Sequence, residues 1–314
     1  MAIDCSVIIC TYNRCSLLEK TLRSLMEQSF PADRLEIIVV DNNSTDDTAT
    51  VVRACAVDSP VQISYLLEMN QGLSHARNHG LREARGELVA FIDDDATAVK
   101  TWLVKLLEGF DDPRTACAGG RVVPAWQAPR SEWPKWLHER LVGFFSVVEY
   151  PDRRELHYPG YPAGTNIAFR KQALENTGIF NPRLGRTGKS LLSMEETDLC
   201  LRLERAGHRI VYLPEAVVRH TIAPERLTRD WVRERARWQG ISAAVIEQEF
   251  FPRSFVAAKS LKYLLYIVVG LLGVSFGRIS GNERLRFFCS CQNALCWAYL
   301  QKSLQARLLR SSSR

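Results

Sequence analysis

The feature that most constrains the fold of this chain is an alternation of short apolar runs and helical segments over its N-terminal third. Apolar runs at 7–9, 35–40, 63–67 and 88–92 have the length and composition of buried strands, and apolar residues recur at helical spacing between them. Strands separated by such helices run parallel, so we predict a mostly parallel, doubly wound α/β sheet. Each run ends in a polar turn, and these turns meet at one edge of the sheet, where ligands bind.

Strand and helix signals continue through the second half of the chain, with longer gaps between them. They lie at 165–169, 195–206, 209–213 and 230–247. We predict a sheet domain over residues 1–225 and a helical C-terminal region over residues 226–314.

Positive charge is concentrated in that C-terminal region. The whole chain has 41 Lys and Arg against 35 Asp and Glu, and its net charge of +6 is too small to indicate a nucleic-acid-binding protein. Residues 253–314 hold ten basic residues and a single acidic one, Glu283. They also hold two apolar stretches, 263–277 and 287–300, each shorter than the roughly twenty residues that cross a bilayer. Apolar segments flanked by Arg and Lys predict contact with a membrane surface, and a buried helical hairpin is the alternative.

Three adjacent aspartates, Asp93, Asp94 and Asp95, follow the strand expected at 88–92. Adjacent carboxylates repel one another, so folding alone gives no reason to place them at the end of a buried strand. A divalent cation bound to a diphosphate removes this repulsion, because carboxylate oxygens suit Mg²⁺ or Mn²⁺ and phosphate oxygens complete the coordination. A solvated turn with capping aspartates is the alternative interpretation.

Residues near the ends of the neighbouring strands favour a nucleotide site at the same edge. Asp41 can accept a hydrogen bond from a base or a ribose hydroxyl, the Thr11 hydroxyl can contact a nucleotide, and Arg77 stands in a helix that begins at this edge. Each also has an ordinary explanation as a turn, cap or surface residue. A nicotinamide-dependent oxidoreductase would have a parallel sheet too, but it requires Gly-x-Gly-x-x-Gly where this chain has Thr11-Tyr12-Asn13-Arg14.

The ordered set of motifs resembles the family 2 glycosyltransferases with a GT-A fold, over residues 3–222. The resemblance rests on Val7-Ile8-Ile9-Cys10-Thr11-Tyr12-Asn13-Arg14, Val39-Val40-Asp41-Asn42-Asn43-Ser44-Thr45-Asp46, Ala76-Arg77-Asn78, Phe91-Ile92-Asp93-Asp94-Asp95, Gly164-Thr165-Asn166 and Glu195-Glu196-Thr197-Asp198-Leu199-Cys200-Leu201-Arg202-Leu203. It implies a Rossmann-like GT-A domain with a helical, membrane-proximal extension. It also implies inverting transfer of a sugar from a nucleoside-diphosphate sugar, most often of uridine diphosphate, to a hydroxyl of a glycan or lipid-linked acceptor, in cell-surface polysaccharide or glycolipid synthesis.

The resemblance further implies roles for single residues. The donor nucleotide would be held by Thr11, Tyr12, Asn13, Arg14, Asp41, Asn43, Arg77, Asp93 and Asp94. Asp95, which ends the DXD motif, and His220 would bind Mn²⁺ or Mg²⁺, with a surface histidine as the alternative for His220. Gly164, Thr165, Asn166 and Glu195 would lie near the donor or acceptor sugar.

Glu196 would be the catalytic base of such an enzyme. Glu195-Glu196 stands where relatives usually have Glu-Asp. Adjacent helix residues point about 100° apart, so at most one of the two should face the substrate. We choose Glu196 as the base and expect Glu195 to be stabilised by the helix dipole in the first turn.

We expect a peripheral or monotopic enzyme on the cytoplasmic side of a membrane, because the N-terminal residues lack a signal-peptide pattern. A catalytically silent nucleotide-sugar-binding scaffold of a glycan assembly complex is the alternative function, although the base and the acidic triplet are both present. Three tryptophans, Trp126, Trp133 and Trp136, either stack on an acceptor sugar or take part in ordinary loop packing.

Overall fold

The computed structural model describes residues 2–127, 134–188 and 190–311, and the chain forms two compact units. The first unit comprises Met1–Ala125, Ser146–Lys189 and Glu195–Thr221. The second comprises Trp126–Phe145, Ser190–Met194 and Ile222–Arg314. The division into a sheet domain over residues 1–225 and a helical region over residues 226–314 stays a prediction.

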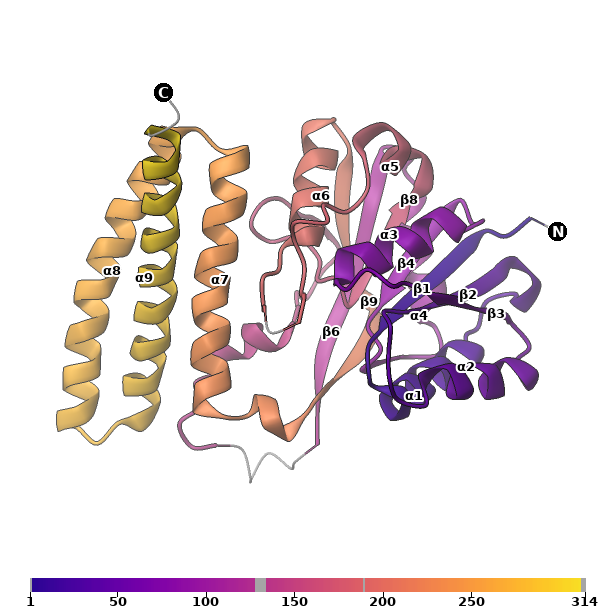
Figure 1. Ribbon diagram of the computed structural model, residues 1–314, viewed down its shortest axis with the longest axis horizontal. Coiled ribbons are helices and arrows are strands. Elements are labelled where there is room, and N and C mark those ends of the chain that lie inside the picture. Colours follow the sequence, from indigo (N-terminus) through magenta and orange to yellow (C-terminus); the bar gives the residue numbers. More distant parts are fainter. Residues whose placement is uncertain (1, 128–133, 189, 312–314) are drawn as a thin grey trace. The chain divides into compact units, whose positions relative to one another are not determined.

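The first unit is built on a mixed sheet (Figure 1). The strands are β1 (Cys5–Thr11), β2 (Leu35–Asp41), β3 (Gln62–Leu67), β4 (Leu88–Ile92), β5 (Ala96–Ala98), β6 (Thr115–Trp126), β7 (Arg154–Glu155), β8 (Asn166–Arg170) and β9 (Arg209–Ile222). Their order is β3-β2-β1-β4-β8-β6-β9-β5, with β7 paired to β9. The predicted parallel sheet is confirmed for β1 to β4, whereas β8 pairs antiparallel with both β4 and β6.

Helices cover this sheet and bury its central strands. The α-helices of the first unit are α1 (Cys15–Met26), α2 (Thr48–Val57), α3 (Leu73–Glu83), α4 (Trp102–Leu107), α5 (Lys171–Thr177) and α6 (Glu195–Arg205). Short 3₁₀ helices are η1 (Ala32–Arg34) and η2 (Glu108–Phe110) in this unit, and η4 (Glu139–Phe145) and η5 (Pro224–Arg226) in the second. Successive strand residues point to opposite faces. Val7 and Ile9 therefore join the core formed with α1, while Ile8 lies against Gly80 of α3.

The second unit is centred on three long helices, α7 (Arg229–Phe250), α8 (Arg253–Ile279) and α9 (Glu283–Ser311). α9 packs against both α7 and α8. The buried Glu247 of α7 links the three helices, because it accepts a hydrogen bond from the Tyr299 hydroxyl at 2.8 Å and pairs with Lys259. Half of the apolar stretch expected at 287–300 is buried in this bundle, which favours the hairpin alternative for this stretch.

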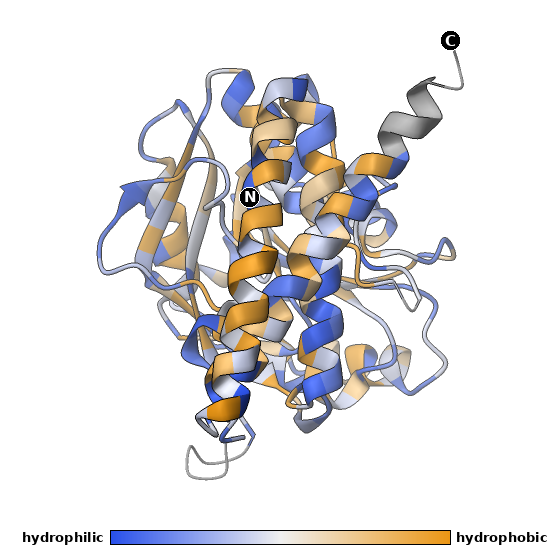
Figure 2. Ribbon diagram, turned by 90° about the vertical axis from the view of Figure 1, so that its left-hand side faces the viewer, coloured by the Kyte–Doolittle hydropathy of each residue, from blue (hydrophilic) through white to orange (hydrophobic). Residues whose placement is uncertain are grey.

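The other apolar stretch, on α8, has a different environment. Glycines of α8 form its contact with α9, because an added Cβ would lie 2.0 Å from Asn293 at Gly270 and 2.5 Å from Cys289 at Gly273. The opposite side of the helix is exposed and apolar, as Figure 2 shows by the orange residues along it. Exposed apolar residues there include Leu261, Leu264, Leu265, Val268, Val269, Leu271, Leu272, Phe276 and Ile279.

α8 is also longer than the apolar stretch expected at 263–277, because it begins at Arg253. Within the part of the chain that the structure describes, it is the one helix whose length and composition would allow it to cross a membrane. This differs from the expectation that neither stretch is long enough, since the helix continues past the uncharged run.

The loop tryptophans pack against other aromatic rings of the second unit. The ring of Trp126 lies edge-on to Phe145 at 5.5 Å, and that of Trp136 lies edge-on to Phe287 at 4.7 Å. These contacts favour the loop-packing alternative for both residues. Trp133 lies outside the described residues.

Candidate active site

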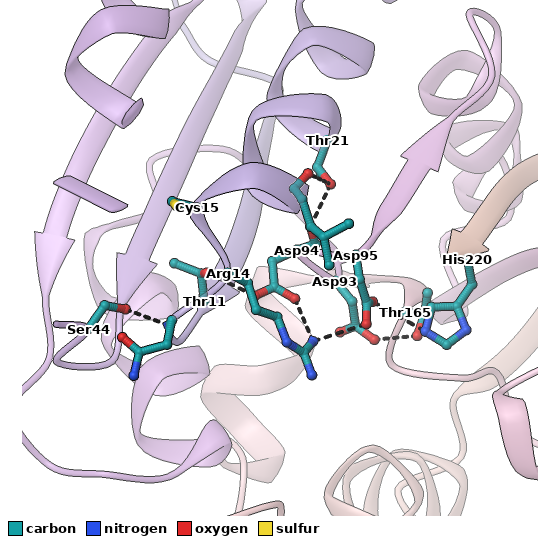
Figure 3. A network of polar contacts seen from close by, with 12 residues as sticks. Thr11, Arg14, Cys15, Thr21, Ser44, Asp93, Asp94, Asp95, Thr165 and His220 are labelled. Carbon is teal, nitrogen blue, oxygen red and sulfur yellow. Dashed lines mark hydrogen bonds and ion pairs between the residues drawn. The ribbon is translucent and has the colours of Figure 1, made fainter. Parts of the chain in front are cut away.

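The acidic turn, Asp93 to Asp95, connects β4 to β5, and its side chains point to different partners (Figure 3). Asp94 accepts a hydrogen bond from the hydroxyl of Thr11, at the end of β1, at 2.8 Å. Asp94 and Asp95 each accept a hydrogen bond from Nη1 of Arg14, both at 3.0 Å. Burial raises the pKa of Asp94 to about 6, against the lowering effect of the Arg14 charge. The sequence-predicted edge is therefore present, with Thr11, Arg14 and the acidic turn in contact.

His220 joins the acidic turn from β9, because Ala96 and His220 are paired across β5 and β9. Its Nε2 lies 3.2 Å from Oδ1 of Asp95, and His220 is only 3% exposed. The alternative of a surface histidine is therefore wrong. An imidazole nitrogen beside a carboxylate oxygen offers two of the ligand types that divalent transition metals accept in proteins.

The donor set fits a divalent cation that binds together with a diphosphate. Among the described residues, no group of three or more His, Cys, Asp or Glu side chains is arranged to hold a metal ion by itself. Such a group is not required, because Mg²⁺ sites with phosphate ligands commonly use only one or two carboxylates. Asp95 and His220 would be the protein ligands, with Asp94 beside them.

Arg77, on α3, connects the acidic turn to the start of α6. It is 3% exposed, with Nη1 2.7 Å from Oε1 of Glu195 and Nη2 3.8 Å from Oδ1 of Asp93. Gly164 leaves the space that this guanidinium occupies, because a Cβ there would lie 2.4 Å from Nη2. Arg77 is thus a buried link between two acidic groups, not a surface residue. Its contact with the nucleotide stays a prediction.

The two glutamates that begin α6 have different environments. Oε2 of both is buried and has no hydrogen-bond partner among the described residues, but the other carboxylate oxygen of Glu195 is held by Arg77. Burial, and after it the charge of Glu195, raise the pKa of Glu196 to about 7. Asp93 is also close enough to contribute to this shift. Glu196 can therefore exchange a proton near neutral pH, as a general base must.

The turns after β1 and β2 hold each other in place. Asn13 and Asn43 have φ angles of 53° and 66°, a conformation that Asn adopts more readily than most residues. Oδ1 of Asn13 accepts a hydrogen bond from the backbone amide of Thr45 at 2.7 Å. Both oxygens of Asp41 have partners, a backbone amide of its own turn and the Tyr65 hydroxyl, each at 2.8 Å. Asp41 therefore shapes the turn, and its contact with a base or ribose stays a prediction.

Two neighbouring residues, Thr165 just before β8 and Asn166 at its start, have different surroundings, and only Thr165 reaches the site. Thr165 donates a hydrogen bond to Oδ2 of Asp93. Asn166 is fully buried, and its amide accepts from Nε1 of Trp102 at 2.8 Å and donates to two backbone carbonyls. The structure therefore corrects the prediction that Asn166 lies near a sugar, because its side chain is buried in the core and its amide is already bound to these three partners. Tyr12 is exposed and lies in the turn beside Asn13.

Thr21 supports the acidic turn but was not among the residues predicted from the sequence. Thr21 of α1 is fully buried and donates a hydrogen bond to the backbone carbonyl of Asp94 at 2.9 Å. It stands among the buried leucines of α1, at a position that helical spacing assigns to the core. A polar residue on an apolar helix face was the available signal that a buried partner exists.

Comparison with known proteins identifies the family. Residues 6–178, more than half of the chain, match the family described as Glycosyl transferase family 2. The chain belongs to this family. As a family 2 glycosyltransferase it transfers sugars, and the resemblance seen in its motifs is confirmed.

Named relatives and a solved structure agree with this family. The glucosyl-dolichyl phosphate glucuronosyltransferase of Haloferax volcanii is 29% identical over 268 residues, which cover 84% of both chains. The succinoglycan biosynthesis protein ExoM of Rhizobium meliloti is 31% identical, over 72% of this chain and 70% of the relative. The mannosyltransferase PcManGT from Pyrobaculum calidifontis, solved in complex with GDP-Man and Mn²⁺, matches 97% of this chain and 88% of its own, with a TM-score of 0.63 and 22% identity. This likeness confirms the predicted GT-A fold.

Proposed function

We propose that this glycosyltransferase is inverting and metal-dependent, with Mn²⁺ or Mg²⁺ as cofactor. It moves a sugar from a nucleoside-diphosphate sugar to a hydroxyl of a glycan or lipid-linked acceptor, and uridine diphosphate is the nucleotide that we propose for the donor. The reaction belongs to cell-surface polysaccharide or glycolipid synthesis. The observation that carries this proposal is the Arg77 link, which holds the start of α6, and with it Glu196, next to the acidic turn. The names of the two relatives and the GDP-Man and Mn²⁺ in PcManGT support it.

The reaction follows from the different states of the two glutamates. The Glu196 carboxylate accepts the proton of the acceptor hydroxyl while that oxygen attacks the anomeric carbon of the donor. The bond from this carbon to the diphosphate breaks on the opposite side, and its electron pair leaves with the nucleoside diphosphate, so the configuration inverts. A bound cation would supply charge stabilisation for the leaving diphosphate. Glu195 does not serve as a nucleophile in this scheme, because Arg77 holds its Oε1 at 2.7 Å.

Donor binding gives a test of metal dependence that does not need the acceptor. With saturating UDP-sugar or GDP-sugar and Mn²⁺, we expect the melting temperature to rise by about 5 °C at a hundredfold excess over Kd. Asp95→Ala should lose the part of this rise that depends on Mn²⁺, as should EDTA with the unchanged protein. Asp111→Ala, at the exposed residue that follows η2, is the matched control. A donor-induced rise of equal size with Mn²⁺ and with EDTA would contradict metal dependence. Donor binding without any donor hydrolysis or transfer would favour the scaffold alternative.

We further propose that α8 binds the cytoplasmic surface of a membrane, as a peripheral or monotopic anchor. Its glycine side is occupied by α9, so its exposed leucines have no partner of their own within the described part of the second unit. Arg253, Lys259 and Lys262 flank the apolar part on one side and Arg278 on the other, which suits anionic lipid headgroups. Because α9, which lies against α8, also packs against the charge-rich helix α7, α8 would lie on the bilayer and not span it.

Vesicle binding tests this anchor. We expect the protein to sediment with phosphatidylglycerol vesicles and less with phosphatidylcholine vesicles, with a decrease at high salt. Replacing both Leu265 and Leu272 by Gln should weaken binding at least about tenfold, because two leucines are no longer buried in lipid. The control replaces Val57 and Leu67, two exposed apolar residues of the first unit, by Gln. Equal binding of the α8 double variant and the unchanged protein would contradict the proposal.

A further inference from the structure

Arg14 is already bound to the acidic turn. Its Nη1 lies 3.0 Å from Oδ1 of Asp94 and 3.0 Å from Oδ2 of Asp95. The two aspartates are 4% and 5% exposed, whereas the Arg14 side chain is 38% exposed. Two buried carboxylates therefore share the positive charge of one partly exposed side chain, which lies between them in Figure 3.

The carboxylates are held in place without Arg14. Asp94 accepts a hydrogen bond from the Thr11 side chain at 2.8 Å, and its backbone carbonyl accepts one from Thr21 at 2.9 Å. Oδ1 of Asp95 lies 3.2 Å from Nε2 of His220, and the Asp95 backbone carbonyl accepts a hydrogen bond from the amide of Thr221 at 2.8 Å. Arg14, in contrast, stands at the N-cap of α1, in a turn whose residues are partly exposed. Its long side chain can leave the aspartates by rotation of its own bonds. The carboxylates are thus the fixed part of this contact, and the guanidinium is the movable part.

A guanidinium and a divalent cation cannot share this position. A metal ion held by Asp95 and His220 would bind the same carboxylate group that Nη1 contacts through its other oxygen, and a doubly charged ion this close to a guanidinium is repelled by it. Removing Arg14 with nothing in its place is also unfavourable, because two adjacent buried carboxylates then repel each other. The arrangement therefore favours one cation at a time at the Asp94 and Asp95 carboxylates, either the guanidinium or the metal ion.

We propose that Arg14 is the resident counter-ion of Asp94 and Asp95 and exchanges with the divalent cation during donor binding. As the cation binds, the guanidinium leaves the aspartates and pairs with phosphate oxygens of the nucleoside diphosphate. This inference rests on the metal-dependent transfer proposed above. It makes the cation and the nucleotide bind cooperatively, because the cation alone displaces Arg14 without giving it a new partner.

Mn²⁺ binding to variants of Arg14 tests this exchange. Calorimetry and the electron paramagnetic resonance signal of free Mn²⁺ would measure affinity at pH 8, without nucleotide and with UDP or GDP. We expect Arg14→Met to bind Mn²⁺ alone about tenfold more tightly than the unchanged protein, because no guanidinium has to be displaced. UDP or GDP should then increase Mn²⁺ affinity less in Arg14→Met than in the unchanged protein. Arg14→Lys, which keeps the charge, should stay near the unchanged protein.

Controls keep the outcomes separate. Arg23→Met removes an arginine of the same helix that pairs with Glu19, and it should leave Mn²⁺ affinity unchanged. If Arg14→Met does not fold, as judged by circular dichroism, Arg14→Gln takes its place with the same expected direction. Equal Mn²⁺ affinity of this variant and the unchanged protein overturns the exchange but leaves the proposed function intact. An unchanged protein that binds no Mn²⁺, even with UDP or GDP, overturns the metal-dependent function and the exchange with it.

Discussion

In Glu196→Gln, kcat should fall by about a hundredfold to ten-thousandfold, while donor affinity stays near that of the unchanged protein. The substitution keeps the size of the side chain and removes the group that accepts the acceptor proton. Oε2 of Glu196 is buried without a hydrogen-bond partner in the described structure, so little else depends on its charge. Single-turnover transfer and donor binding, measured side by side, check this. Full activity would move the base to Glu195 or elsewhere.

The raised pKa of Glu196 also predicts how activity and stability depend on pH. Because the pKa is raised to about 7, the base is ionised only above that pH, so kcat should rise with pH through about 7 and then level off. Burial disfavours the ionised form, so Glu196 lowers folding stability progressively as pH rises from its ordinary pKa through about 7. Glu196→Gln should therefore raise the melting temperature at pH 8 and change it little at pH 4. Glu175→Gln, the same change at an exposed glutamate of α5, is the control for both measurements.

Arg77→Met should lower the free energy of unfolding by about 3 kcal/mol or more, because it leaves Glu195 buried without its counter-ion. Methionine keeps much of the contact with the Phe91 and Phe180 rings, over which the guanidinium lies. Transfer should fall as well, since the start of α6 is no longer held at the acidic turn. Urea denaturation followed by circular dichroism measures the first effect.

A second substitution separates the ion pair from simple packing. Adding Glu195→Gln to Arg77→Met should restore part of the lost stability, because the uncompensated buried charge is then gone. Arg82→Met, on the exposed side of the same helix, should change the free energy of unfolding by less than about 0.5 kcal/mol. If Arg77→Met and Arg82→Met have the same free energy of unfolding, the contact of Arg77 with Glu195 does not stabilise the fold.

Much of the fold and the location of the site could be predicted from the sequence. Strand periodicity and polar turns are local properties of the sequence. Parallel strands bring their carboxyl ends to one edge of the sheet, and this does not depend on which other strands join the sheet. Thr11 and Asp94 are far apart in the chain, yet their hydrogen bond forms at the edge where the strand pattern places both. The family could be recognised for the same reason, because its motifs lie in these turns.

The prediction for Asn166 failed, and other features were not predicted, where side-chain direction or strand pairing decides. Asn166 belongs to the matching motif but points into the core, while its neighbour Thr165 reaches Asp93. The antiparallel pairing of β8 with β4 and β6 has no local signature. The two C-terminal apolar stretches look alike in composition, yet one is buried by α7 and α8 and the other is exposed.

The sequence by itself determined the parallel half of the sheet, the edge that carries the acidic turn and the family of the protein, because periodicity and turn residues act over a few neighbouring positions. Only the tertiary structure decided which charges meet. Arg14 with Asp94 and Asp95, Arg77 with Glu195, and His220 with Asp95 are pairs between distant segments. Burial forces such charges to find partners, and the fold determines which partners are within reach.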